Sequence, residues 1–171
     1  MENFIHRVIG ASKLKVSTYE DVEADKSSLG QAITVVMLSS LAASLSLSGL
    51  TESPRIALVL ANFMIAWLLW AWLTFFIGTR ILPEPQTEAN WGQLLRTTGF
   101  AASPGILRFL GILPGLTIPI YLLTEIWMLV AFIIAVRQAL DYTTTGRAVG
   151  VCLIGWSIAM TFNLILRGLI S

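Results

Sequence analysis

The chain has 171 residues, of which 56% are hydrophobic and 12% are charged, and its formal net charge is +1. Soluble domains carry about twice this share of charged residues, so the composition excludes an ordinary soluble domain and indicates a membrane protein. The near-neutral charge argues against nucleic acid as a partner, and a single cysteine and a single histidine, Cys152 and His6, argue against a metal site. No cofactor is expected.

The apolar runs predict an all-α fold, a polytopic transmembrane helix bundle of about five spans that each need about 20 residues. Residues 1–28 are expected to form a cytoplasmic amphipathic and acidic N-terminal segment, and residues 29–171 the transmembrane domain. The spans are expected at roughly 29–50, 55–82, 99–119, 118–139 and 147–169.

The first residues have the pattern of an amphipathic helix. Phe4, Ile5, Val8 and Ile9 recur at helical spacing, while the charged residues take other directions. Such a helix suits a membrane surface better than a crossing. Packing against the cytoplasmic ends of the spans is the alternative.

An acidic segment follows, from Ser17 to Asp25. Ser17 and Glu20 have capping-box spacing, which predicts a short helix at this point, and Asp25 or a following serine can cap the first span. Tyr19, Glu20 and Asp25 are candidate contact residues on the cytoplasmic side. A patch of carboxylates that binds a cation or a basic partner is the functional alternative, because spacings of three and four place carboxylates on one helix face.

The first span carries Ser40, Ser44 and Ser48 at intervals of four residues. Small residues repeated in this way let helix backbones approach closely, which predicts a packing face. The neighbour is another span of the same chain or a second subunit, and we favour the same chain.

The stretch from Gly99 to Pro119 organises the rest of the chain. It is apolar, but Pro104 and Pro114 each remove a backbone donor, and Arg108 places a charge inside it. We therefore expect a broken third span with the other spans packed around it, because freed carbonyls at membrane depth need partners in the protein.

Arg108 has a candidate partner in Glu125 of the next span. At about 1.5 Å of rise per residue, both residues fall in the outer half of the bilayer, which favours an ion pair. Two alternatives are that Arg108 extends to the outer headgroups and that Glu125 is a proton or cation site.

A polar turn, from Asp141 to Arg147, separates the fourth and fifth spans. Arg137 and Asp141 are four residues apart at a helix end, and Arg147 can approach the same carboxylate or the last carbonyls of the helix. These three residues are candidates for a cytoplasmic contact site held by charge. A solvated turn with positive residues is the alternative.

Lysine and arginine residues favour one set of loops. With a cytoplasmic amino terminus, the outside holds only Arg55 and Arg167, and the inside holds Arg7, Lys13, Lys15, Lys26, Arg80, Arg96, Arg137 and Arg147. The positive-inside rule therefore predicts a cytoplasmic amino terminus and an outside carboxyl terminus, in the plasma (inner) membrane if the protein is prokaryotic.

Gly99, Phe100, Ala101 and Pro104, within the sequence Gly-Phe-Ala-Ala-Ser-Pro, resemble the Gly-Tyr/Phe-Ser/Ala-x-x-Pro signature of the Yip (Ypt-interacting protein) domain family. Stretches within 7–25 and 135–148 also resemble short prokaryotic members, so the similarity covers almost the whole chain. The resemblance implies a five-span membrane protein without known catalytic activity.

Eukaryotic relatives in that family lie in Golgi and endoplasmic reticulum membranes and bind Rab-type GTPases and one another. Only residues 1–28 precede the first expected span here, and the long cytosolic region with an Asp-Leu-Tyr-Gly-Pro-type motif is missing, so binding of a small GTPase is not carried over. We expect membrane lipids, and other membrane proteins or a second copy, as partners.

Three classes of function are compatible with the sequence. A non-catalytic scaffold or interaction protein in membrane organisation or trafficking-like processes leads. A small transporter or channel that uses Arg108 and Glu125 is the alternative. An intramembrane enzyme is least favoured, because the chain has no His-Glu-x-x-His motif, no Gly-x-Ser-x-Gly motif and no paired intramembrane aspartates.

Overall fold

The computed structural model describes the backbone of residues 2–48 and 53–170 and the side chains of residues 3–46, 57 and 60–158. This part of the chain is helical and contains no strand, which confirms the predicted all-α class. The elements are α1 (Glu2–Ser12), α2 (Val16–Ala24), η1 (Lys26–Ser28), α3 (Leu29–Ser48), α4 (Ser53–Phe76), η2 (Ile77–Ile81), α5 (Trp91–Ala101), η3 (Ser103–Ile112), α6 (Thr117–Ala139) and α7 (Thr145–Ile170).

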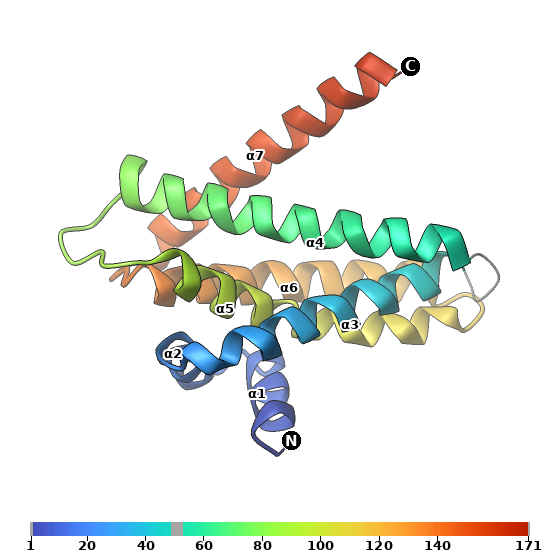
Figure 1. The fold of residues 1–171 in the computed structure, drawn as a ribbon, viewed down its shortest axis with the longest axis horizontal. Helices are drawn as coiled ribbons and strands as arrows, with labels where there is room; N and C mark the ends of the chain where they lie inside the picture. The colour runs from blue at the N-terminus through green and yellow to red at the C-terminus, as the bar shows by residue number, and fades with distance from the viewer. Residues whose placement is uncertain (1, 49–52, 171) are drawn as a thin grey trace.

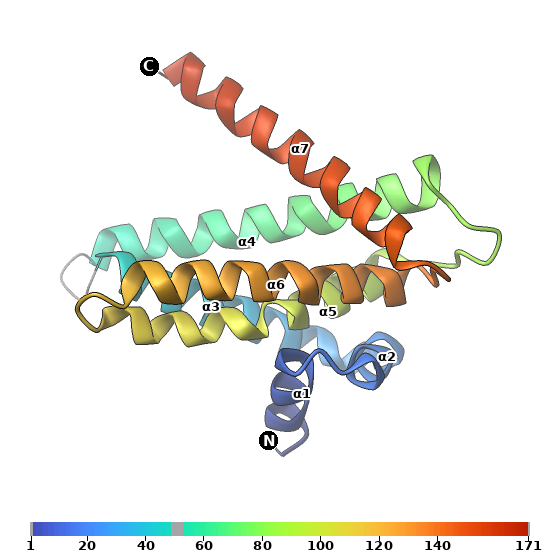
Figure 2. The same cartoon turned by 180° about the vertical axis from the view of Figure 1, so that it is seen from behind.

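The long helices form a bundle. Figure 1 shows α3, α4, α6 and the α5–η3 segment side by side along the longest axis, while α7 crosses them and its C-terminal half points away. Figure 2 shows the same order from behind. We call the end of the bundle that carries α2, the loop 82–90 and the turn 140–145 the polar end.

Helices of membrane-spanning length are present. The stretches Lys26–Ser46, Leu60–Ile81 and Thr117–Ala139 are long and apolar enough to cross a bilayer, and the described apolar part of α7, Thr145–Ile158, is shorter. The expected third span is the α5–η3 segment, which is interrupted at Ala102. The predicted bundle with a broken third segment is therefore confirmed.

The break follows from Pro104. A proline has no N–H to donate, and α5 gives way after Ala101 to the 3₁₀ helix η3, with Pro104 in its first turn. With about 3 residues per turn, a 3₁₀ helix places every third residue on one face. Gly105, Arg108 and Gly111 are accordingly all buried.

This face of η3 packs very closely on α3. A Cβ on Gly105 would overlap Ser39 Oγ, and a Cβ on Gly111 would overlap Ser46 Oγ. The glycines are six residues apart, about two 3₁₀ turns, and the serines seven apart, about two α-helical turns, so the two spacings match.

The predicted serine face is corrected in part. Ser40 and Ser44 are buried, the side chain of Ser48 lies outside the described residues, and the closest approach of the two segments is made through Ser39 and Ser46. The packing partner is the same chain, as favoured from the sequence.

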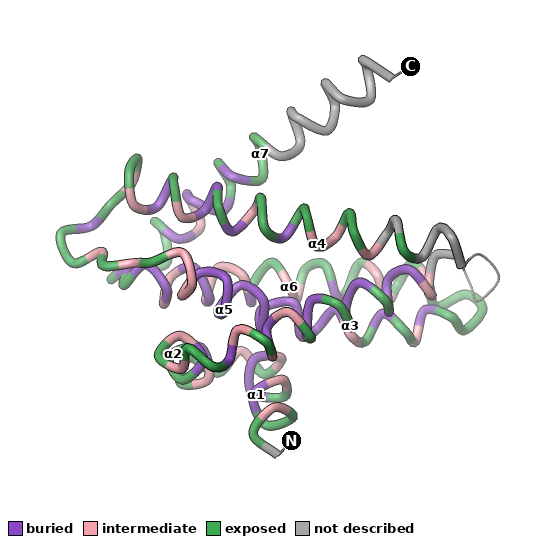
Figure 3. The backbone as a smooth tube through the Cα atoms, viewed as in Figure 1, coloured by how far each residue is buried: buried purple, intermediate pink, exposed green. Residues whose placement is uncertain are grey.

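Large apolar side chains cover the outside of the bundle away from the polar end. On α6 they run from Ile118 to Val130, and on α3 from Met37 to Leu41. Figure 3 shows the buried residues concentrated in α5 and on the inner sides of α3 and α6. We call the outward-facing apolar surface of α3 and α6 the apolar belt.

Candidate functional site

Arg108 lies inside the bundle, 2% exposed, and three residues of α6 hold its guanidinium group. Its Nε donates to Thr124 Oγ1 at 3.1 Å, its Nη2 lies 2.5 Å from Glu125 Oε1, and its Cζ lies 4.3 Å from the centre of the Tyr121 ring. Positions 121, 124 and 125 share one helix face, so a single surface of α6 surrounds the charge. The two residues expected to pair are in contact.

A pocket of about 280 Å³ adjoins this ion pair. Its walls are mostly apolar and aromatic, and Arg108 and Glu125 are its charged residues. Glu125 is about half exposed, with a side-chain exposure of 52%. The pocket is lined by Val36, Ser39, Ser40, Phe63, Ala66, Trp67, Trp70, Ala102, Arg108, Glu125, Met128, Leu129, Phe132 and Trp156.

Two tryptophans of the pocket wall differ in how their indole N–H groups are satisfied. Trp67 Nε1 donates to Thr98 Oγ1 at 3.2 Å, whereas the buried Nε1 of Trp70 has no hydrogen-bond partner. Across the described residues, no group of three or more His, Cys, Asp or Glu side chains is placed to hold a metal ion.

The Gly-Phe-Ala-Ala-Ser-Pro residues are packing residues. A Cβ on Gly99 would lie 2.7 Å from Ala32 Cβ, Phe100 and Ala101 are fully buried, and Pro104 is buried where η3 begins. This motif joins the third segment to α3 and does not form an exposed contact surface.

Tyr19 is fully buried, so the prediction that it is a surface contact residue is wrong. Its hydroxyl donates to Ala11 O at 3.1 Å, and burial raises its pKa. The helix also begins at Val16, with Lys15 at the N-cap and no side-chain cap, so the predicted capping box at Ser17 is absent. The aromatic ring of Tyr19 serves to pack α2 against α1 and the bundle.

Arg7 of α1 pairs with two carboxylates of the acidic segment. It is 4% exposed and lies 2.8 Å from carboxylate oxygens of both Asp21 and Asp25. Asp25 also accepts hydrogen bonds from the Ser27 hydroxyl and N–H, and these bonds, together with Arg7, lower its pKa. Asp25 is thus an internal partner and caps η1, ahead of α3.

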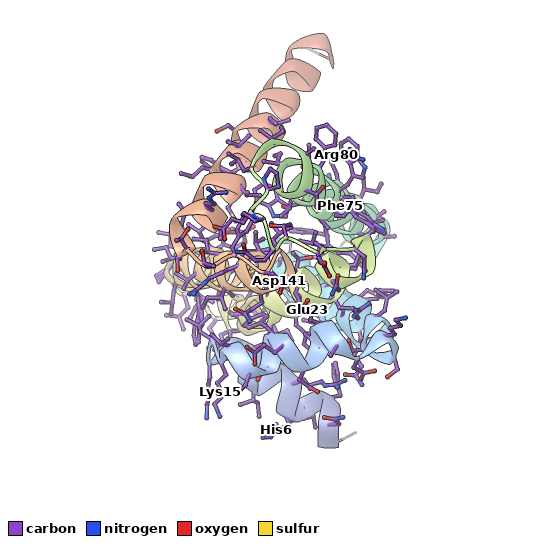
Figure 4. The ribbon with its side chains drawn as sticks, turned by 90° about the vertical axis from the view of Figure 1, so that its left-hand side faces the viewer. His6, Lys15, Glu23, Phe75, Arg80 and Asp141 are labelled. Carbon is purple, nitrogen blue, oxygen red and sulfur yellow. The ribbon has the colours of Figure 1, made fainter. Side chains whose placement is uncertain are left out.

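Glu23 of α2 contacts α5. Its Oε1 accepts from Gln93 Nε2 at 3.0 Å, and its own carbonyl accepts from Arg96 Nη2. Figure 4 shows Glu23 and Asp141 near each other at the polar end. Burial, the charge of Asp141 and that of Glu20 raise the pKa of Glu23 to about 7, against the opposing effect of Arg96.

The turn after α6 is held by a carboxylate that the sequence reading missed. Arg147 Nε lies 3.3 Å from Glu84 Oε1, and Glu84 Oε2 accepts from the N–H and hydroxyl of Thr143 at 3.0 and 2.9 Å. The Thr143 hydrogen bonds hold the pKa of Glu84 below its usual range. Its position between Pro83 and Pro85, two residues that restrict the backbone on either side of it, was the available signal.

The predicted pairing of Arg137 and Arg147 with Asp141 is therefore wrong. Arg137 donates to the carbonyls of Tyr142 and Thr143 in the turn, and Arg147 contacts neither Asp141 nor the last carbonyls of α6 but Glu84 and Pro83 O. Asp141 has a positive φ of 52°, so its role is to turn the chain.

The remaining candidate, Glu20, is exposed and accepts from Gln138 Nε2 of α6 at 3.1 Å. Glu20, Asp25, Arg137, Asp141 and Arg147 all lie at the polar end. They do not form a single cluster. Asp25 pairs with Arg7, Glu20 binds Gln138, and the other three belong to the turn after α6 and its contacts with Glu84.

Comparison with protein-family models identifies one match, the Yip1 domain, over residues 15–166. Comparisons with curated proteins and with solved structures find no match.

Proposed function

The chain belongs to the Yip1 domain family, and from this membership we propose that it is a non-catalytic scaffold or interaction protein of a membrane. Its polar end is the contact surface. We place that end and the amino terminus in the cytoplasm, because the positive-inside rule assigns them there.

The observation that carries this proposal is that the polar end is tied together across the whole chain. Arg96 Nε donates to Val22 O at 3.0 Å, Gln138 Nε2 to Glu20 Oε1 at 3.1 Å, and Arg147 Nη1 to Pro83 O at 2.9 Å. These bonds join α2 to α5 and to α6, and α7 to the loop 82–90. A surface ordered in advance loses little conformational entropy on binding, which favours a partner protein.

Site-specific photocrosslinking in native membranes tests this proposal. A photoreactive residue at Glu88, exposed at the polar end, should give a discrete protein adduct, and the same residue at Ile126 in the apolar belt serves as the matched control. Arg96→Gln should weaken the Glu88 adduct, because it unties α2 from α5. Lipid adducts alone at Glu88 would contradict a protein-binding role.

A small transporter or channel is the second candidate, and the pocket beside Glu125 supports it. A half-exposed carboxylate in a candidate span is a typical element of ion pathways. Flux of protons or cations into sealed vesicles that contain the purified protein tests it. Flux that Glu125→Gln abolishes would favour transport; vesicles that stay as tight as protein-free ones would rule it out for these ions.

A further inference from the structure

We propose that the pocket beside Arg108 and Glu125 binds a neutral, lipid-soluble alcohol. The molecule enters from the lipid side, its hydroxyl group meets the Glu125 carboxylate, and its hydrocarbon part lies among the aromatic side chains of the wall. This inference concerns the inside of the bundle, so it goes beyond the scaffold role of the polar end and does not depend on it.

The pocket has a buried floor and an exposed apolar rim. Ser40, Trp67 and Ala102 line it and are 3%, 7% and 6% exposed. Leu129 of α6 and Trp156 of α7 also line it, and they are 51% and 54% exposed. Leu129 belongs to the apolar belt, so the pocket opens on a surface that lipid tails cover.

An aromatic pair lies between the pocket and the polar end. Helices α4 and α6 both run toward that end (Figure 1), and Trp70 and Phe132 are the lining residues nearest to it on each helix. Their rings meet edge to face, with centroids 6.4 Å apart. A molecule dissolved in the lipid therefore has the more direct route into the pocket.

The volume of the pocket sets the size of the occupant. An apolar cavity of about 150 Å³ holds one benzene molecule, so a pocket of about 280 Å³ holds roughly ten to twelve non-hydrogen atoms. One medium-length hydrocarbon chain has this size. A whole phospholipid with two chains does not fit.

The charges of the wall favour a neutral molecule. Arg108 and Glu125 are the charged residues that line the pocket, and they are paired with each other through Glu125 Oε1. A cation would compete with Arg108 for this carboxylate. An anion would meet the carboxylate first, because Glu125 is half exposed and Arg108 is buried. An uncharged ligand leaves the ion pair intact, so no charge in the bundle loses its partner.

Two polar groups of the wall remain for hydrogen bonds with a ligand. Within the described residues, the contacts of Glu125 use Oε1 alone, which leaves Oε2 as an acceptor. The buried Nε1 of Trp70 is a donor without a partner, and such a group favours a ligand that supplies an acceptor. A hydroxyl group both donates and accepts, so it suits either position.

Competitive photolabelling of the full-length protein in phosphatidylcholine nanodiscs tests the proposal. The probe is 1-decanol with a diazirine in its chain, because its size matches the pocket. We expect the labelled peptides to come from the pocket walls in α4 and α6. Unlabelled 1-decanol should reduce this labelling several-fold at a membrane mole fraction at which decane, which lacks the hydroxyl group, has little effect.

Two substitutions on α4 provide a matched pair. Ala66 is exposed and lines the pocket, whereas Ala61 is exposed on the same helix outside it. Ala66→Phe should reduce the labelling that 1-decanol displaces several-fold, because the ring fills the pocket. Ala61→Phe should leave this labelling unchanged. Melting temperatures of both variants check that the fold is retained.

Three outcomes would overturn the proposal. Equal competition by decane would show that the pocket takes any hydrocarbon chain. Stronger competition by decyltrimethylammonium or by decanoate would show that it selects a charged ligand. Labelling that is spread over the apolar belt and is equal in the two variants would show that there is no site. The crosslinking at Glu88 tests the scaffold role separately, so the two failures are distinguishable.

Discussion

At the scale of single residues, Arg108 explains how a charge is kept in an apolar segment. Its guanidinium group is bonded to Thr124 and Glu125 and stacked on Tyr121, so the charge never faces apolar surroundings alone. A buried ion pair contributes little net stability, but removal of one partner leaves the other uncompensated. The pair thus sets which face of α6 meets η3.

We predict that Arg108→Met destabilises the protein by about 3–5 kcal/mol, because Glu125 loses its partner. The double variant with Glu125→Leu should recover most of that loss. Thermal unfolding of the purified protein in mild detergent measures both. A double variant as unstable as Arg108→Met would show that the two side chains do not act as a pair.

Gly105 gives a second test at this scale. Gly105→Ala should cost about 1–3 kcal/mol, the usual effect of overpacking, because the new methyl group would overlap Ser39 Oγ. Gly30→Ala, at a helical glycine with open space around it, is the matched control and should cause no loss. Equal melting temperatures for the two variants would exclude the close packing of η3 on α3.

At the scale of elements, α1 and α6 end in the same way. In each, a residue with positive φ follows the helix, Leu14 at 59° and Asp141 at 52°. Lys15 N donates to Gly10 O and Tyr142 N to Arg137 O, each at 3.0 Å, which is the long bond of a Schellman motif. These turns direct α2 and α7 back onto the bundle.

Asp141 is therefore required for its backbone and not for its charge. Asp141→Gly and Asp141→Asn should fold as well as the wild type, since both residues accept the left-handed conformation. Asp141→Val should lose about 1–2 kcal/mol. Detergent-based melting curves of the three variants test this, and loss of stability in Asp141→Asn would restore a role for the carboxylate.

The α2–α5 contact should depend on pH. The pKa of Glu23 is raised to about 7 in the folded protein from an ordinary value of 4.5. The folded state then binds more protons than the unfolded state between these values, so the contribution of Glu23 to stability is present below about pH 4.5 and is lost as pH rises through 7.

Glu23→Gln should flatten this dependence, because glutamine keeps the size of the side chain and cannot ionise. The difference in melting temperature between wild type and variant, followed from pH 4.5 to above 7, isolates the effect from other titrating groups. A constant difference across that range would contradict a raised pKa at this site.

At the scale of the whole molecule, the alternation of the long helices places distant segments at the same end. Figure 1 shows α2 and the turn before α7 at the polar end, and the start of α4 at the opposite end. The fold thus requires Ser17 and Thr144 to share one side of the membrane and Ser53 to face the other.

Cysteines at Ser17, Ser53 and Thr144, in a background without Cys152, test this arrangement. In intact cells an impermeant maleimide should label position 53 at once, and positions 17 and 144 only after the membrane is opened. Reversed labelling of all three would invert the predicted orientation but keep the fold. Labelling of positions 17 and 144 from different sides would contradict the fold itself.

The sequence by itself determined the helical membrane class, the break at Pro104 and the partner of Arg108. The first two depend on local chemistry, and the third follows because the expected next span offers few acidic residues as a partner for Arg108. Apolar runs need no partner to be recognised, a proline inside a helical run removes a backbone donor, and Glu125 is the acidic residue of the expected next span.

Only the tertiary structure decided which residues meet between distant segments. Arg147 contacts Glu84 and not the nearby Asp141, Tyr19 is buried, and η3 meets Ser39 and Ser46. The 3₁₀ period of η3 selects different positions from an α-helical one, and the raised pKa of Glu23 exists only because α2, α5 and the turn after α6 converge. Spacing along the chain cannot encode such contacts. Each helix forms because of its own local sequence, but the contacts between helices depend on how the helices pack against one another.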